Sequence, residues 1–525
     1  HHVFFHFSVD GEMGSSERLW RRLLGFFGGD ATGSGEIGVD DIGVWLRKHP
    51  LDCLTFVVVD DAARFAGHQD VRARLLSLSE MDENLVVICA SDTSPHTWRG
   101  ASVELEPLTQ QQVRMIAYQY FHRYGKTIED EYLKLLCSNE TLRNPLFLKC
   151  LLNEQRTALS FDGFEAAFRR LSSLCGFDEL VGSIGMRLSD QLHDLGVGDS
   201  SVWFAMRVLA SVKGGLYEEE ILSCSGILPL AWSLVRAAFQ PVLREYDGLW
   251  SVANSVIRDA FAATSLHHLP GIDGVAHERL VGLFSSQGVT ARSTDELAYQ
   301  HLVTGDEDAL LELLGSSSRI AVLAAERRES LVAYLTKVQG RSDELAGPIA
   351  GGLEDAFPSP EAFGNMLLAL NDAGCYRAVA KLSSLLKPKM PLPEGCDLAL
   401  VMNEARAEYK MGAAHYSDAA ILYDEASRLA AEFDRDTMLP LLAEILFKRA
   451  IVEKSSGYPD RARRSYEDAV GIYRTLGIED GNASWAMGNL ASLLYLFGED
   501  ERSRKLFDEA VRLRIRAFGE RSPEV

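Results

Sequence analysis

A repeated pattern in residues 397–525 constrains the fold more strongly than any other feature of the sequence. An alanine precedes a glycine by seven residues three times, and a small–aromatic–small triplet follows each glycine. The alanines are Ala405, Ala450 and Ala491, the glycines are Gly412, Gly457 and Gly498, and the triplets are Ala419–Tyr423–Ala426, Ala462–Tyr466–Ala469 and Ser503–Phe507–Ala510. The last residues of successive triplets are 43 and 41 positions apart. Because small residues let paired helices approach closely and the aromatic fills the gap between pairs, the pattern predicts stacked helix pairs.

Two features border this pattern. The turn of the first unit is two residues longer than the turns of the next two, and Gly374–Ala378 is a candidate for an earlier, degenerate unit. Between them, Lys387–Pro393 contains three prolines and predicts a linker.

A second informative stretch is Leu54–Asp61, which reads Leu-Thr-Phe-Val-Val-Val-Asp-Asp. Its continuous, β-branched apolar run is typical of a strand buried on both faces of a parallel sheet. Asp60 and Asp61 follow directly, at the strand end where open α/β sheets bind ligands. In phosphate-binding sheets such an acid, called Walker B, holds Mg²⁺ through water. The alternative is a core strand followed by a solvated turn, and these eight residues do not decide between the two.

Other segments extend the sheet prediction. Val3–Phe7 and Leu85–Ala90 are strand-like, and helical patterns alternate with them, which predicts a partial α/β parallel sheet. The sequence contains no Gly-x-x-x-x-Gly-Lys-Ser/Thr phosphate-binding loop. Gly125-Lys126-Thr127 does not supply one, because position 120 is Tyr and residues 110–124 form a helical pattern.

The periodicity is helical from Thr109 to Phe261. Thr109 and Asn144 stand where helix N-caps are expected, and Pro145 occupies the first turn of the helix after Asn144. Residues 202–262 give three helices and then a short strand over 248–252, an order that fits a winged helix. A generic helical subdomain fits nearly as well, and further helices of weaker pattern follow over 266–386.

Composition narrows the class of protein. The net charge of −22 argues against nucleic-acid binding through a phosphate-neutralising surface and against an anionic membrane partner. No apolar run approaches 18 residues, so no membrane span is predicted. The eight cysteines are scattered without a Cys-x-x-Cys pair, which suits buried thiols in a reducing, cytoplasmic compartment. His267, His268 and His277 match no standard zinc spacing, and helix-end histidines are the simpler interpretation.

The repeats resemble tetratricopeptide repeats in the form of about 42 residues found in kinesin light chains. The front of the chain resembles the second half of a NACHT domain of the STAND class of signalling P-loop NTPases. The residues that carry this second resemblance are Phe4–Phe7, Val57–Asp60, Val86–Ser91, Leu105–Leu108 and Asn144–Lys149. The order of modules resembles that of the nephrocystin-3 family.

The resemblance implies four domains. They are the C-terminal part of a NACHT-like domain over 1–158, a helical or winged-helix domain over 159–265, helices with degenerate repeats over 266–390, and tetratricopeptide repeats over 397–525. Since the chain opens on a strand-like run, we expect the missing phosphate-binding loop to lie upstream of His1.

The resemblance also assigns site residues. Asp60 would hold Mg²⁺ through water with Asp61 beside it, Ser91 would stand at the sensor position, and Pro145 would approach the adenine. NACHT strands usually continue with a further acid that orients water, whereas Ala62 and Ala63 follow here. We therefore expect ATP and Mg²⁺ only in a longer protein, with slow hydrolysis at most, and no cofactor on this chain alone.

Three functions remain open from the sequence. The first is a signalling or scaffold protein in which a NACHT-like nucleotide switch is joined to repeats that bind a partner peptide or helix on their concave face. The second is an active STAND-class ATPase, and the third is an adaptor with an inactive NTPase fold. The nephrocystin resemblance alone implies association with cilia.

Overall fold

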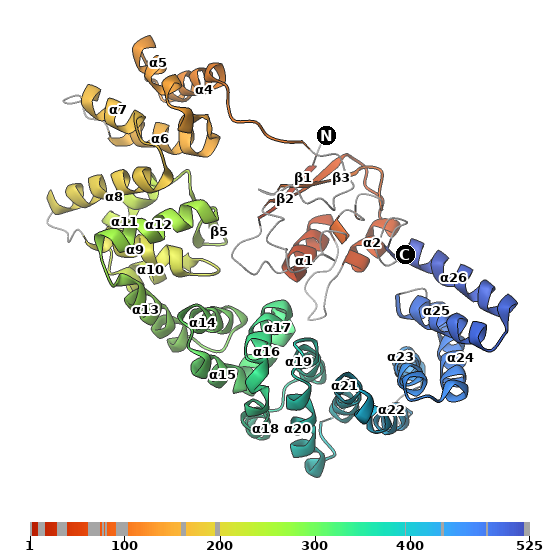
Figure 1. Cartoon of the computed structure of the whole chain (residues 1–525). Helices are drawn as coiled ribbons and strands as arrows, with labels where there is room; N and C mark the ends of the chain where they lie inside the picture. Colours follow the sequence, from red (N-terminus) through yellow and green to blue (C-terminus); the bar gives the residue numbers. More distant parts are fainter. Residues whose placement is uncertain are drawn as a thin grey trace. The chain divides into compact units, whose positions relative to one another are not determined.

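The computed structural model is mostly helical, with two small sheets, and it divides into two compact units (Figure 1). One unit contains residues 1–98 and 289–525, and the other contains residues 99–288. The structure describes residues 3–8, 16–28, 39–60, 74–75, 78, 81–90, 103–158, 164–194, 200–393, 395–431, 435–478 and 481–518.

The predicted parallel sheet is present. β2 (Thr55–Asp60) lies between β1 (Val3–Ser8) and β3 (Leu85–Cys89), and both pairings are parallel. Two helices, α1 (Ser16–Phe27) and α2 (Val39–Lys48), share its core. The side chains of β2 that point into this core, those of Val57 and Val59, are fully buried.

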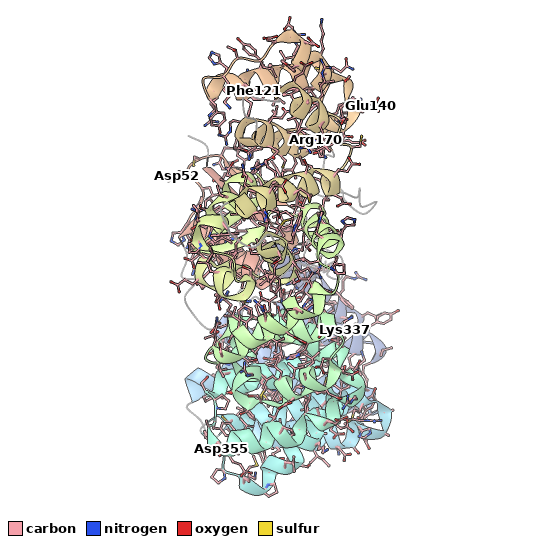
Figure 2. All side chains as sticks on the ribbon, turned by 90° about the vertical axis from the view of Figure 1, so that its left-hand side faces the viewer. Asp52, Phe121, Glu140, Arg170, Lys337 and Asp355 are labelled. Atoms are coloured by element: carbon pink, nitrogen blue, oxygen red, sulfur yellow. The ribbon has the colours of Figure 1, made fainter. Side chains whose placement is uncertain are left out.

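A group of five α-helices and one 3₁₀ helix begins the second unit. In Figure 2, Phe121, Glu140 and Arg170 mark three of its elements, and Phe121 is buried. The predicted caps are confirmed, because Thr109 and Gln112 form a capping box and the Asn144 side chain accepts from the amides of Leu146 and Phe147. The helices are α4 (Gln110–Arg123), α5 (Asp130–Ser138), η2 (Glu140–Arg143, 3₁₀), α6 (Pro145–Ala158), α7 (Phe164–Ser172) and α8 (Phe177–Asp194).

The rest of this unit combines helices with a three-stranded antiparallel sheet of order β4-β6-β5. Sequence periodicity predicted β6 but not the other two strands, because β4 has only two residues and β5 is mostly exposed and polar. The elements are α9 (Ser200–Ser211), β4 (Leu216–Tyr217), α10 (Glu218–Ser225), α11 (Pro229–Ala238), β5 (Leu243–Tyr246), β6 (Leu249–Val252), α12 (Ser255–His268) and α13 (Ile272–Ser286).

Residues from 291 onward form a succession of helices. They begin with α14 (Ala291–Thr304), α15 (Glu307–Gly315), α16 (Ser317–Glu326), α17 (Arg328–Lys337), η3 (Gln339–Glu344), α18 (Ala346–Asp355), α19 (Pro360–Asp372), α20 (Tyr376–Leu386) and η4 (Lys387–Lys389). They continue with α21 (Cys396–Met411), η5 (Ala413–His415), α22 (Tyr416–Ala430), α23 (Arg435–Ser455), α24 (Pro459–Leu476), α25 (Gly481–Leu496) and α26 (Asp500–Phe518). Each helix from α21 to α25 packs on the next one, as the stacked-pair prediction requires (Figure 1).

The proline-rich segment does not separate two cores, so the prediction of a linker there is wrong. Leu382 and Leu386 before it and Cys396 and Leu400 after it are buried in one hydrophobic cluster. A polar contact also crosses the segment, since the Ser383 hydroxyl donates to Glu404 Oε2 over 2.7 Å. The prolines shape a short connection between packed helices, and the packing on both sides holds it.

Among the described residues, no single helix is both long enough and apolar enough to cross a membrane. The pair α10 and α11, bent by 111°, meets that requirement only when the two helices are counted together.

Candidate functional site

The small and aromatic repeat residues lie at helix contacts. Ala405, Ala450 and Ala491 have no exposed surface, and Tyr423 and Tyr466 are buried. Phe507, predicted to fill the same kind of gap, is instead 40% exposed. Tyr423 packs in a cluster with residues of the next helix, α23, and Tyr466 does so with residues of α25. No described helix follows α26, so the Phe507 ring has no such neighbour in the described part of the chain.

A groove of about 610 Å³ lies on the first helices of successive pairs, α19, α21 and α23, and Tyr423 of α22 also lines it. On α21 its lining follows one helix face at positions 398, 402, 406 and 409–410, and on α23 at 441, 444, 448 and 451. Its lining is more apolar than polar. The principal side chains are Leu368, Leu398, Met402, Asn403, Arg406, Tyr409, Lys410, Tyr423, Met438, Leu441, Glu444, Lys448 and Ile451.

The charged side chains of the groove are mainly basic. Arg406 is held in place by Asp372, with 2.7 Å between Nη2 and Oδ1. Lys448 is half-buried, and this burial lowers the pKa of its ammonium group, while neighbouring Glu444 raises it. In the described part of the chain no carboxylate lies within 4 Å of Lys448 Nζ, which sits 5.2 Å from the Phe447 ring centroid. The groove therefore carries positive charge that its own residues do not fully neutralise.

The residues expected at a nucleotide site are only partly described. Asp60 is the last residue of β2, opposite Ser8 of β1, so its backbone stands at the predicted carboxyl end of the central strand. Asp61 and Ser91 lie outside the described residues. Pro145 is exposed at the start of α6, in the other unit. One carboxylate position therefore fits a Mg²⁺ ligand, and its assignment stays a prediction.

The contacts of Lys126 and His268 bear on two other interpretations of the sequence. Lys126 follows α4, as the helical reading of residues 110–124 requires, and its ammonium donates to the Arg156 carbonyl at 2.9 Å. His268 stacks on Trp203 with 3.9 Å between ring centroids, and burial lowers the pKa of its imidazole. The Trp203 contact gives His268 a packing role at the end of α12.

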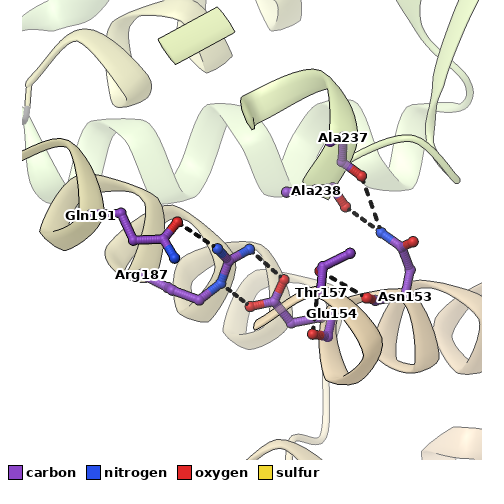
Figure 3. Close-up of polar contacts among 7 residues, drawn as sticks. All are labelled: Asn153, Glu154, Thr157, Arg187, Gln191, Ala237 and Ala238. Carbon is purple, nitrogen blue, oxygen red and sulfur yellow. Dashed lines mark hydrogen bonds and ion pairs between the residues drawn. The ribbon is translucent and has the colours of Figure 1, made fainter. Parts of the chain in front are cut away.

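A buried polar cluster on α6 was not predicted from the sequence (Figure 3). Glu154, only 1% exposed, accepts from Arg187 of α8 through two contacts, 2.5 Å from Nε to Oε1 and 2.7 Å from Nη2 to Oε2. Asn153 donates to the carbonyls of Ala237 and Ala238 at the end of α11. The available signal was the polar run Asn153–Arg156 after the apolar residues Leu151 and Leu152, because polar residues on a buried helix face need partners.

Comparisons with known proteins identify the repeats. A tetratricopeptide-repeat family model matches residues 484–524. The C-terminal part of the chain therefore contains tetratricopeptide repeats, which confirms the class that the resemblance implied. No curated protein matches the chain.

Two solved structures are similar in backbone. One is a STAND protein with a tetratricopeptide repeat sensor from Pyrococcus horikoshii, at 12% identity and a TM-score of 0.42, covering 98% of this chain and 81% of that one. The other contains the nearly identical TPR-like repeats of a kinesin light chain from Podospora anserina, at 17% identity and a TM-score of 0.28, covering 44% and 97%. At these scores neither likeness supports an argument about function.

Proposed function

We propose that this chain is a protein-interaction scaffold whose groove on α19, α21 and α23 binds an acidic partner segment that also carries apolar side chains. The observation that carries the proposal is the groove itself, an apolar surface bordered by Arg406, Lys410 and Lys448. Repeat stacks of this kind use the surface of successive helices to bind extended or helical peptides.

The groove chemistry favours an acidic occupant for two reasons. Lys448 already bears the cost of partial burial, so a carboxylate brought beside it gains a charged partner that needs little further desolvation. Met402, Leu441 and Ile451 offer an apolar floor, and burying an aliphatic side chain there contributes about 1.5–3 kcal/mol. Together the two contacts select a segment in which acidic and aliphatic residues alternate.

The test is fluorescence anisotropy with a short labelled peptide that alternates Glu and Leu. We expect the double variant Lys410→Glu/Lys448→Glu to weaken binding at least about tenfold, a change of 1.4 kcal/mol. The matched control is Arg504→Glu/Lys505→Glu, two charge reversals at exposed positions of α26 outside the groove. Equal weakening of peptide binding in the test and control variants would show that the net charge of the protein causes the loss. That result would refute the groove as the binding site.

A second function, a nucleotide-dependent switch, is favoured by the position of Asp60 at the end of the central parallel strand. In this proposal residues 1–158 belong to a NACHT-like, P-loop-type module, and α9–α12 with the β4-β6-β5 sheet form a winged helix that couples it to the repeats. ATP with Mg²⁺ is its ligand. An active ATPase and an adaptor with an inactive fold are the alternatives, and turnover separates them.

Calorimetry with MgATP tests the switch on this chain and on the protein extended upstream. Binding by the extended protein that Asp60→Ala abolishes would support it, whereas unchanged affinity would remove Asp60 from the site. The nephrocystin-like order of modules and a cytoplasmic, cilium-associated location belong to the same proposal, and imaging of the tagged protein in ciliated cells tests that location.

A further inference from the structure

The turn between α21 and α22 differs from the two turns that follow it in the repeats. Its two additional residues make room for the 3₁₀ turn η5, whereas α23 to α24 and α25 to α26 connect more tightly. When the second helices are aligned by their starts, the residue before each is His415, Tyr458 and Glu499, and the third residue within each is Asp418, Arg461 and Arg502. Of these three turns, the first thus has a histidine before the second helix. At the third position of that helix it has an acidic residue where the other two have arginine.

The longer turn brings three ligand-type side chains together. His415 Nδ1 lies 2.7 Å from Glu408 Oε2 of α21, and Asp418 contributes a carboxylate from the first turn of α22. One donor atom from each of the three residues lies within 4.8 Å of the others. The Glu408 side chain is 14% exposed and that of His415 is 42% exposed, so the cluster is anchored on one side and open to solvent on the other.

The corresponding carboxylate of the next repeat is neutralised differently. Glu453, in the same helical position as Glu408, accepts from Ser465 Oγ at 2.7 Å and lies 3.8 Å from Arg449 Nε. In the described part of the chain no lysine or arginine nitrogen lies within 4 Å of the carboxylates of Glu408 or Asp418. Two carboxylates therefore face one imidazole without the cation that balances the equivalent site.

We propose that Glu408, His415 and Asp418 bind a divalent transition-metal ion, with Zn²⁺ as the best match. One imidazole nitrogen and two carboxylate oxygens form a ligand set that Zn²⁺ accepts, and water completes its tetrahedral geometry. The imidazole disfavours Mg²⁺ and Ca²⁺, which take oxygen ligands. The ion would replace the hydrogen bond between His415 and Glu408 and would tie the end of α21 to the start of α22.

Calorimetric titration of the whole chain with ZnCl₂ tests this site. Asp418→Arg restores the residue of the next two repeats, and His415→Ala removes the nitrogen ligand. We expect binding of one ion by the wild type and a loss of affinity of at least about tenfold in each variant. Glu453→Gln is the matched control in the second repeat, and its affinity should equal that of the wild type.

The cysteines are an alternative source of zinc binding, since Cys175 is exposed. A thiolate site would survive both His415→Ala and Asp418→Arg and would give Co²⁺ a sulfur charge-transfer band, which the proposed site lacks. Zinc binding that survives both substitutions, a sulfur charge-transfer band with Co²⁺, or absence of zinc binding by the wild type would each overturn the proposal. Melting curves of the metal-free variants that match the wild type would show that any lost affinity reflects lost ligands.

Discussion

The repeats and the α6–α8–α11 cluster solve the same problem, holding helices together, with opposite chemistry. In the repeats the contacts that recur from unit to unit are made by small and aromatic residues, with Ala450 and Ala491 buried between helices and Tyr466 among them. Between α6 and its neighbours a buried polar cluster adds to the apolar packing, with Glu154 paired to Arg187 and Asn153 bonded to the last carbonyls of α11 (Figure 3). The apolar interface can be repeated along the chain, whereas the polar one fits a single partner arrangement.

The difference concerns how each interface responds to loss of one side chain. An apolar contact loses stability in proportion to the volume or area changed. Removing one partner of a buried ion pair lowers the free energy of unfolding by more than the intact pair contributes to it, because the remaining charge stays desolvated. Substitutions in the two regions should therefore differ in size and in whether a second substitution restores stability.

The largest expected effect is that of Arg187→Leu, which leaves the Glu154 carboxylate buried and unpaired. We expect a loss of about 3–5 kcal/mol in the free energy of unfolding, measured by urea denaturation. The double variant Glu154→Met/Arg187→Leu should recover most of it, since neither charge remains. A double variant as unstable as the single one would show that the cluster acts through shape rather than charge.

Ala491→Trp should have a smaller effect in the repeats. Ala491 has no exposed surface between α25 and α26, so the indole overpacks the contact and destabilises it by about 1–3 kcal/mol. Thermal melting followed by circular dichroism measures the loss. Lys505→Trp, at an exposed position of α26, is the control, and equal melting of both variants would contradict close helix packing at Ala491.

The smallest effect concerns Lys448 and depends on pH. Burial lowers the pKa of Lys448 in the folded protein, so protonation is less favourable there than in the unfolded chain. This penalty is complete below the folded pKa and disappears as pH approaches the unfolded value of about 10.4. Lys448→Met should therefore raise the melting temperature slightly near pH 7. Above the unfolded pKa of about 10.4 it should leave the melting temperature unchanged. A constant difference at all pH values would exclude the titration of Lys448 as its cause.

Sequence reasoning succeeded where a contact recurs or where local chemistry fixes it. The spacing of Ala405, Ala450 and Ala491 predicted the repeats, and the apolar run before Asp60 predicted the central parallel strand. Caps such as Thr109 were predictable because their hydrogen bonds join residues close in the chain.

The groove and the polar cluster were harder to predict from the sequence because their residues come from distant segments of the chain. Glu154 and Arg187 are 33 residues apart, and nothing in the spacing of either predicts the other. Lys448 lines the groove beside residues of two other helices, so its environment depends on how the helices stack. The error at the proline-rich segment had a similar origin, because composition indicated the turn but not the core that crosses it.

That shared core has a consequence for proteolysis. Cleavage of the backbone within 387–393 would leave Leu386 on one fragment and Leu400 on the other, both still buried in one cluster. The two pieces should therefore remain together as a nicked complex, as complementary fragments do, and separate only under denaturing conditions. A recombinant piece that begins at residue 397 would instead expose Leu400 and Ala407, which that cluster buries in the whole chain, and be prone to aggregation.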